Sequence, residues 1–126
     1  MNLIEQLAGY SECERLRKVP AASSFRIRGI EFTREELERA MLEHRRANNI
    51  FEVGDWVYPL SRILDEHEGI GRFILVEKGE LVVVREVKQK GLYVSHEHRH
   101  DNSFYVYFNE IRHATDEEIA AGRRLP

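Results

Sequence analysis

The chain has 126 residues, of which 42% are hydrophobic and 33% are charged. This length and composition fit one globular domain, or a small domain with an appendage, and exclude a disordered chain. Nineteen basic and 22 acidic residues give a net charge of -3, which argues against a protein that mainly clamps a phosphate backbone.

The single cysteine, Cys13, excludes an intramolecular disulfide and a zinc site built on paired cysteines. The first residues carry glutamates and lack the basic-then-apolar order of a signal peptide, and no run of 18 apolar residues occurs. We therefore expect a cytoplasmic protein in a reducing compartment, without a membrane partner.

The first fifty residues contain one weak helix pattern and one strong one. Apolar residues from Leu3 to Leu16 predict a short helix over residues 2–18, interrupted at Gly9, and residues 24–32 alternate like a short strand or an extended arm that bends at Gly29. Thr33 and Glu36 then form a capping box, which predicts a helix over residues 33–47. Its single apolar stripe is expected to lie on the sheet that follows.

Five strand-like segments follow Ile50, separated by short turns. They are "FEVGDWVYPL", "GRFILVE", "ELVVVREV", "GLYVSHEH" and "SFYVYF". So little chain in five strands predicts a small, bent barrel. The long connection over residues 61–71 is a candidate functional loop that carries acidic side chains. These are Asp65, Glu66 and Glu68.

A second capping box, Thr115 with Glu118, predicts a brief helix at the end of the chain. The expected fold is therefore α+β, with N-terminal helices (residues 1–49) packed on a five-stranded antiparallel barrel (50–112) and a short C-terminal helix (113–126).

Two segments carry a resemblance. "FEVGDWV", with its Gly-Asp turn before the first strand, resembles the opening of SH3-like barrels, and "FYVYFNEIRHATDEEIAAG" resembles the closing strand, turn and tail of small proteins encoded by phages and prophages of Gram-positive bacteria. The resemblance covers roughly residues 50–122. It implies a phage accessory protein, a class that includes inhibitors of host polymerases, nucleases and defence systems.

Three histidines stand at alternate positions in "VSHEHRHDNSF": His96, His98 and His100. On an extended strand they would share one face, about 6.6 Å apart. They are a candidate metal site, with Glu66 or His67 as a further ligand, because neutral imidazoles bind zinc. The alternative is a hairpin end whose histidines make ordinary hydrogen bonds.

Three tyrosines alternate with apolar residues on the same two strands, so we expect Tyr93, Tyr105 and Tyr107 to face outward together with Arg99. Aromatic side chains and arginine are common anchors of binding surfaces. In the alternative, the helix over residues 33–47 covers these rings as a second small core.

The sequence contains no Gly-rich phosphate loop, no Gly-x-Ser-x-Gly and no His-Glu-x-x-His. We therefore predict a protein that is not an enzyme and needs no cofactor. Together with the resemblance to phage proteins, which implies a host partner, the tyrosines and the acidic loop predict binding to a host protein such as a nucleic-acid-processing enzyme. One alternative is a nucleic-acid-binding module that uses the tyrosines for stacking and four arginines for phosphates. These are Arg26, Arg28, Arg45 and Arg46. A monomer and a homodimer both stay open.

Overall fold

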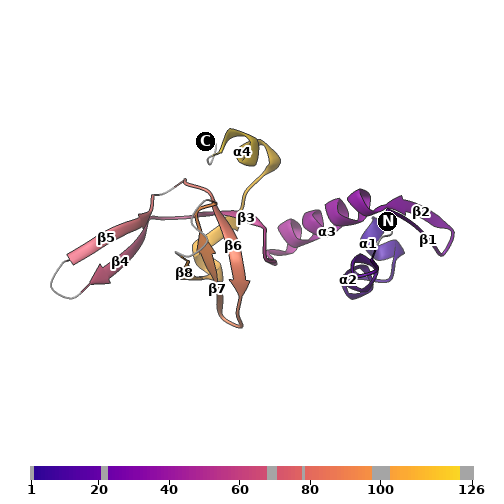
Figure 1. Cartoon of the computed structure of the whole chain (residues 1–126), viewed down its shortest axis with the longest axis horizontal. Coiled ribbons are helices and arrows are strands. Elements are labelled where there is room, and N and C mark those ends of the chain that lie inside the picture. The colour runs from indigo at the N-terminus through magenta and orange to yellow at the C-terminus, as the bar shows by residue number, and fades with distance from the viewer. Residues whose placement is uncertain (1, 21–22, 68–70, 78, 98–102, 123–126) are drawn as a thin grey trace. The chain divides into compact units, whose positions relative to one another are not determined.

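The computed structural model describes residues 2–20, 23–67, 71–77, 79–97 and 103–122, except for the side chains of residues 65–75. The chain divides into two compact units, Met1–Ile50 and Phe51–Pro126 (Figure 1). Each unit has a hydrophobic core of its own. The protein is α+β, with helices in both units and a five-stranded antiparallel sheet in the second.

The N-terminal unit is built from three helices and one hairpin. Its elements are α1 (Leu3–Gln6), α2 (Tyr10–Arg17), β1 (Ser24–Ile27), β2 (Ile30–Thr33) and α3 (Arg34–Asn48). Gly9, with φ of 108°, separates α1 from α2, where the sequence placed the interruption. Arg28 and Gly29 both have positive φ, which suits the two-residue turn of a hairpin, so the predicted strand with a bend at Gly29 is a pair of strands.

The predicted capping box at the start of α3 is confirmed. The Thr33 hydroxyl accepts the Glu36 N–H at 3.0 Å, and the Glu36 carboxylate accepts the Thr33 N–H at 3.2 Å. Asn49, in the left-handed conformation, ends the helix. These contacts satisfy backbone groups that a helix leaves unpaired, which is why so local a pattern predicted the helix correctly.

The apolar stripe of α3 is buried within the N-terminal unit. Leu37 and Met41 are fully buried, and they share a core with residues of α1, α2 and β2. The other members are Ile4, Leu7, Cys13, Leu16 and Phe32. The sequence assigned this stripe to the sheet, whereas the structure covers it with neighbours in the same unit, because the short helices and the hairpin each have an apolar face that none can bury alone.

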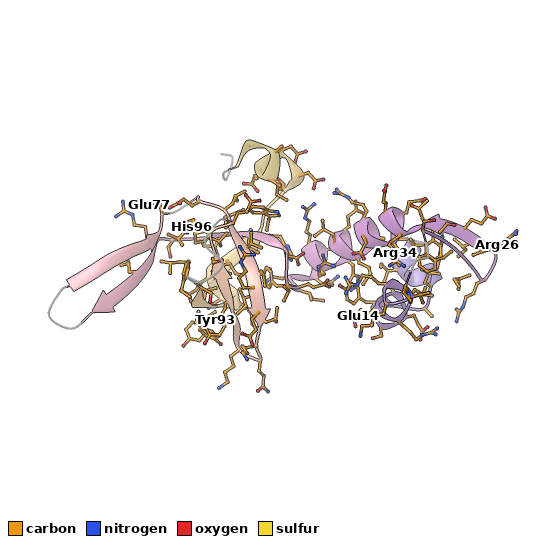
Figure 2. All side chains as sticks on the ribbon, in the orientation of Figure 1. Glu14, Arg26, Arg34, Glu77, Tyr93 and His96 are labelled. Carbon is orange, nitrogen blue, oxygen red and sulfur yellow. The ribbon has the colours of Figure 1, made fainter. Side chains whose placement is uncertain are left out.

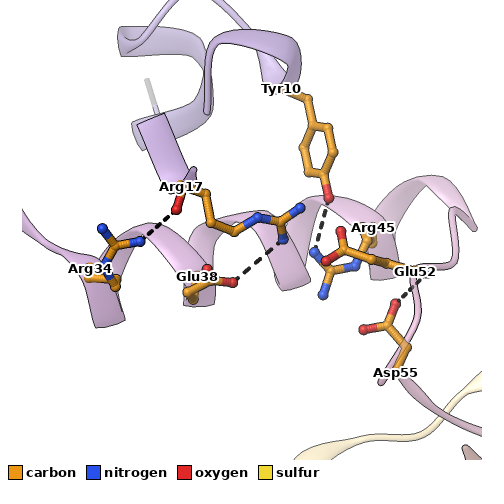
Figure 3. Close-up of polar contacts among 7 residues, drawn as sticks. All are labelled: Tyr10, Arg17, Arg34, Glu38, Arg45, Glu52 and Asp55. Atoms are coloured by element: carbon orange, nitrogen blue, oxygen red, sulfur yellow. Dashed lines mark hydrogen bonds and ion pairs between the residues drawn. The ribbon is translucent and has the colours of Figure 1, made fainter. Parts of the chain in front are cut away.

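Polar contacts also link the helices of this unit (Figure 3). Arg34 donates to the carbonyl of Arg17 at 2.7 Å, and the Arg17 guanidinium lies 3.6 Å from the Glu38 carboxylate. Arg45, which is almost fully buried, donates to the hydroxyl of Tyr10 at 3.0 Å. These bonds join α2 to α3, so the unit is held by polar as well as apolar contacts.

The C-terminal unit contains the large sheet. Its strands are β3 (Trp56–Pro59), β4 (Ile63–His67), β5 (Gly71–Val76), β6 (Val82–Val87), β7 (Gly91–Ser95), β8 (Phe104–Tyr107) and β9 (Ile111–His113). The order in the five-stranded sheet is β8-β7-β6-β3-β9, and β4 pairs with β5 in a separate hairpin. The Gly-Asp turn immediately precedes β3, and the Asp55 carboxylate accepts the Glu52 N–H at 2.9 Å.

The number of strands in the sheet agrees with the prediction, but their identities do not. β5 leaves the sheet for the β4–β5 hairpin, and the three-residue strand β9 takes the fifth place by pairing with β3. Among the described residues the sheet has two open edges, β8 and β9, and is not closed into a barrel. Membership of a sheet depends on distant pairing, which strand propensity does not encode.

The predicted acidic loop is also different. Asp65 and Glu66 lie in β4, opposite Phe73 and Arg72 of β5, so this part of the connection is a strand. Glu68 lies outside the described residues. Successive charged residues break the alternation of apolar and polar side chains that identified the other strands, so the sequence did not predict a strand here. The segment is a strand because it pairs with β5.

The end of the unit follows the prediction more closely. A short 3-10 helix, η1 (Phe108–Glu110), links β8 to β9, and the helix α4 (Asp116–Ala121) begins at the capping box of Thr115 and Glu118. No helix in the described part of the chain is long and apolar enough to cross a membrane.

Candidate partner-binding surface

The three tyrosines predicted to face outward do share one face of the sheet. Tyr93 of β7 lies directly opposite Tyr105 of β8, while their strand neighbours Leu92, Val94 and Val106 are buried in the core. Tyr107 lies two residues beyond Tyr105 and therefore on the same face. The period of two thus placed these side chains correctly.

The rings form a connected cluster, which we call the tyrosine cluster (Tyr93, Tyr105 and Tyr107). The centroids of Tyr93 and Tyr105 are 5.3 Å apart and those of Tyr105 and Tyr107 are 5.5 Å apart, both edge to face. Each such pair contributes about 0.5–1.5 kcal/mol beyond area burial. Tyr105 is 39% exposed and Tyr107 is 56% exposed, so the cluster is ordered by its own contacts and still presents aromatic surface.

Gly91 makes room for this arrangement, and the sequence analysis did not identify it. It lies opposite Tyr107, and a Cβ atom there would be 2.3 Å from the carbonyl oxygen of Val106 and 2.7 Å from the Tyr105 ring. The Tyr105 ring therefore lies over backbone that carries no side chain. Only the paired register reveals this role of the glycine.

The same face continues across the sheet beyond the tyrosine cluster. Trp56 pairs with Val83 and Val83 pairs with Ser95, so all three side chains belong to the outer face. Trp56 is half-buried, whereas Val83 and Ser95 are buried. Ser95 therefore shares the face of Tyr93 but is covered.

Arg85 accounts for part of that cover. An irregularity in the β6–β7 pairing lies at this residue, and its Nε donates to the Ser95 hydroxyl at 2.7 Å. Its Nη2 donates to the carbonyls of His96 at 3.2 Å and Glu97 at 3.0 Å. Arg85 thus fixes the backbone where β7 ends, a role that the sequence alone did not indicate.

Only the first residues of the histidine tract, His96 and Glu97, are described. Strand β7 ends at Ser95, so His96 lies beyond it, and His98 and His100 lie outside the described residues. The placement of the three imidazoles on one face therefore stays a prediction. His96 Nε2 lies 3.2 Å from the Glu80 carboxylate and is half-buried. His96 and Tyr93 lie apart on the C-terminal unit (Figure 2).

The predicted metal site and the predicted binding surface are therefore both only partly described. Within the described residues no group of three His, Cys, Asp or Glu side chains is arranged to hold a metal ion. Arg99 lies outside that part of the chain, and the side chains of Asp65 and Glu66 are likewise not described.

An ion pair borders the tyrosine cluster at the β6–β7 turn. Glu86 lies opposite Tyr93, and Lys88 Nζ is 2.6 Å from the Glu86 carboxylate. The Lys88 ammonium donates a hydrogen bond to Glu86, and this bond, together with the negative charge of Glu86, raises the pKa of Lys88 above its usual value. The exposed pair adds a polar rim to an aromatic centre, which is the usual anatomy of an interface.

The arginines assigned to phosphate contacts are less suited to that role than the sequence indicated. Arg26 and Arg28 are exposed on the β1–β2 hairpin, and Arg26 lies 3.6 Å from the Glu31 carboxylate. Arg45 is buried and bonded to Tyr10, so it is not on a surface that a nucleic acid reaches.

Comparisons with known proteins add no assignment, since no family model, curated protein or solved structure matches the chain.

Proposed function

We propose that the protein is a non-enzymatic binding protein whose C-terminal unit docks on another protein through the tyrosine cluster. The observation that carries this proposal is the pair of exposed phenol rings, Tyr105 and Tyr107, held edge to face on a sheet. Rigid aromatic side chains bury a large area at little cost in conformational entropy, which is why tyrosine is enriched among residues that dominate binding energy.

The proposal extends to the nature of the unit and of its partner. A Gly-Asp turn before the first strand, a sheet whose first and last strands pair, and a short turn before the last strand all support an SH3-like domain. The resemblance of the closing segment to phage proteins supports a role as a phage accessory protein. In that role the protein would bind a host nuclease, defence protein or transcription enzyme and inhibit or modulate it.

The test is a quantitative binding comparison. Purified wild-type protein and the double variant Tyr105→Ala, Tyr107→Ala are used to capture partners from the lysate of a Gram-positive host, and the captured protein is then titrated with each. Losing two anchoring residues at about 2 kcal/mol each should weaken binding by 100-fold or more. Val53→Ala, at a 60% exposed position in the same unit, is the matched control.

The result that would refute the tyrosine cluster as the interface is equal affinity of the wild-type protein and the double variant. Both tyrosines are exposed, so we expect the double variant to fold. Unchanged fluorescence of Trp56, the single tryptophan of the chain, would confirm this.

Direct nucleic-acid binding is the second candidate, and the exposed Arg26 and Arg28 on one hairpin favour it. Titration with a single-stranded oligonucleotide decides between the two. Affinity that falls steeply with salt, and that Arg26→Ala with Arg28→Ala removes, would support nucleic-acid binding in place of protein docking. The histidine-metal alternative is tested by zinc content after chelation and dialysis, compared with His98→Ala.

A further inference from the structure

The strand that carries two of the tyrosines is an edge of the sheet. Among the described residues β8 pairs with β7 alone. An edge strand directs backbone N–H and C=O groups outward, and proteins commonly protect such edges with lysine, proline or a bulge. The four residues of β8, "FYVY", include neither lysine nor proline, and its pairing with β7 is regular. Within the part of the chain that the structure describes, β8 is thus an edge that its own residues leave open to pairing over a short length.

Two hydrogen bonds establish which backbone groups face the edge. The Tyr107 N–H donates to the Glu110 carboxylate at 2.8 Å, and the Gly91 carbonyl accepts the Lys88 N–H at 2.8 Å. Both groups therefore point away from the β7–β8 ladder, so the opposed residues Gly91 and Tyr107 are a pair without hydrogen bonds between them.

Such pairs alternate with hydrogen-bonded pairs along two antiparallel strands. Leu92 and Val106 are therefore a hydrogen-bonded pair, and Tyr93 and Tyr105 are again a pair without hydrogen bonds between their backbones. The N–H and C=O of Tyr105 thus point away from β7 toward the edge, whereas the carbonyl of Tyr107 belongs to the first turn of η1. Glu110 occupies the Tyr107 N–H and so ends the available edge.

Charge limits what can occupy this edge. The C-terminal unit holds fourteen acidic and ten basic residues, a net charge of -4, while β8 itself has no charged residue. A second copy of the chain would bring the same excess of negative charge, whereas a basic partner is attracted. The net negative charge of the unit therefore favours a positively charged extended segment.

We propose that β8 accepts an extended, basic segment of the partner protein as an additional strand, which pairs with the backbone of Tyr105 and packs against the Tyr105 and Tyr107 rings. Main-chain bonds would supply affinity and the phenol rings would contact alternate side chains of the segment. This inference rests on the proposed protein-binding function and adds the mode of recognition.

The test starts from a displayed library of random twelve-residue peptides, which is sorted with the full chain. Enriched peptides should alternate β-branched residues with lysine or arginine. The tightest peptide is then added to 15N-labelled protein, and amide hydrogen exchange is followed by NMR. Strand addition should slow exchange of the Tyr105 amide at least tenfold and leave the Tyr107 amide, already bonded to Glu110, nearly unchanged.

A matched pair of variants isolates the backbone contribution. Tyr105→Ala removes the ring and keeps the N–H, whereas Tyr105→Pro removes both, and neither change breaks a bond to β7. We expect the proline variant to bind the peptide about tenfold more weakly than the alanine variant, because one interchain hydrogen bond is lost and its partner carbonyl is left unsatisfied. Unchanged Trp56 fluorescence confirms that both variants are folded.

Three results would overturn the inference. They are enrichment of acidic peptides, a Tyr105 amide that the bound peptide leaves unprotected, and a Tyr105 amide protected by raising the protein concentration alone, which would identify a second copy as the occupant. If the captured host protein loses affinity for the Tyr105→Ala, Tyr107→Ala variant while the proline and alanine variants bind equally, the proposed function stands and the strand addition fails.

Discussion

The two units use aromatic side chains in opposite ways. In the N-terminal unit Tyr10 stacks on His44 at 5.1 Å, with its hydroxyl bonded to Arg45, and Phe25 stacks on the buried Phe32. In the C-terminal unit the tyrosine cluster lies outside the core, with two rings exposed. A ring with buried partners is structural, whereas exposed rings held by one another are available to a partner.

The largest expected effect is a loss of stability in one unit that leaves the other unit folded. Leu37→Ala removes a fully buried side chain from the N-terminal core and should lower the stability of that unit by about 2–5 kcal/mol. The only cysteine, buried Cys13, reports on this unit, and the only tryptophan, Trp56, reports on the other. Alkylation of Cys13 should accelerate while Trp56 fluorescence stays native.

Val84→Ala in the sheet core is the matched control and should give the opposite pattern. If both reporters lose their native signals together in each variant, the two units unfold as one and the comparison fails.

A second change tests whether Gly91 sets the tyrosine cluster. Gly91→Ala forces a Cβ against the Val106 carbonyl and the Tyr105 ring, so the C-terminal unit should lose about 1–3 kcal/mol in denaturant unfolding followed by Trp56 fluorescence. Gly29→Ala is the control, because its φ of 78° is unfavourable but no atom lies within 4 Å. Gly29→Ala should lower the stability of the N-terminal unit only. If both variants lose the same stability when unfolding is followed by Trp56 fluorescence, the proposed role of Gly91 is wrong.

The helix caps should behave alike in both units. Thr33→Ala and Thr115→Ala each remove a side-chain acceptor from the first turn of a helix, and each should cost about 1 kcal/mol. The first loss should appear in Cys13 alkylation and the second in Trp56 fluorescence. Serine at either position keeps the hydroxyl and should retain most of the stability; a loss as large as that of alanine would show that the cap does not stabilise the unit.

The smallest effect concerns pH. Burial, and then the charge of Glu12, raises the pKa of the Cys13 thiol above 9.0. The stabilisation that comes from keeping this thiol protonated is present below pH 9 and is lost as the pH rises through the folded-state pKa, because the unfolded chain releases that proton first. Helical circular dichroism in denaturant should show a steeper loss above pH 9 for the wild type than for Cys13→Ala, and parallel curves would contradict this.

The surface was predictable to the extent that it depends on near neighbours. The alternation of Tyr93 with Leu92 and Val94, and of Tyr105 and Tyr107 with Val106, placed three rings on one face before any partner strand was known. The end of β7 was not predictable in the same way. His96 lies beyond the end of β7, and where a strand ends depends on pairing and on contacts such as those of Arg85.

The sequence by itself determined the helix starts at Thr33 and Thr115, the turn at Gly29 and the alternation of the tyrosines, because each depends on residues a few positions apart. Only the tertiary structure decided that β9 rather than β5 completes the sheet, that Gly91 underlies Tyr105, and that α3 buries its stripe within its own unit. Those outcomes depend on which contacts between distant segments have the lower free energy. A local sequence pattern does not contain that information.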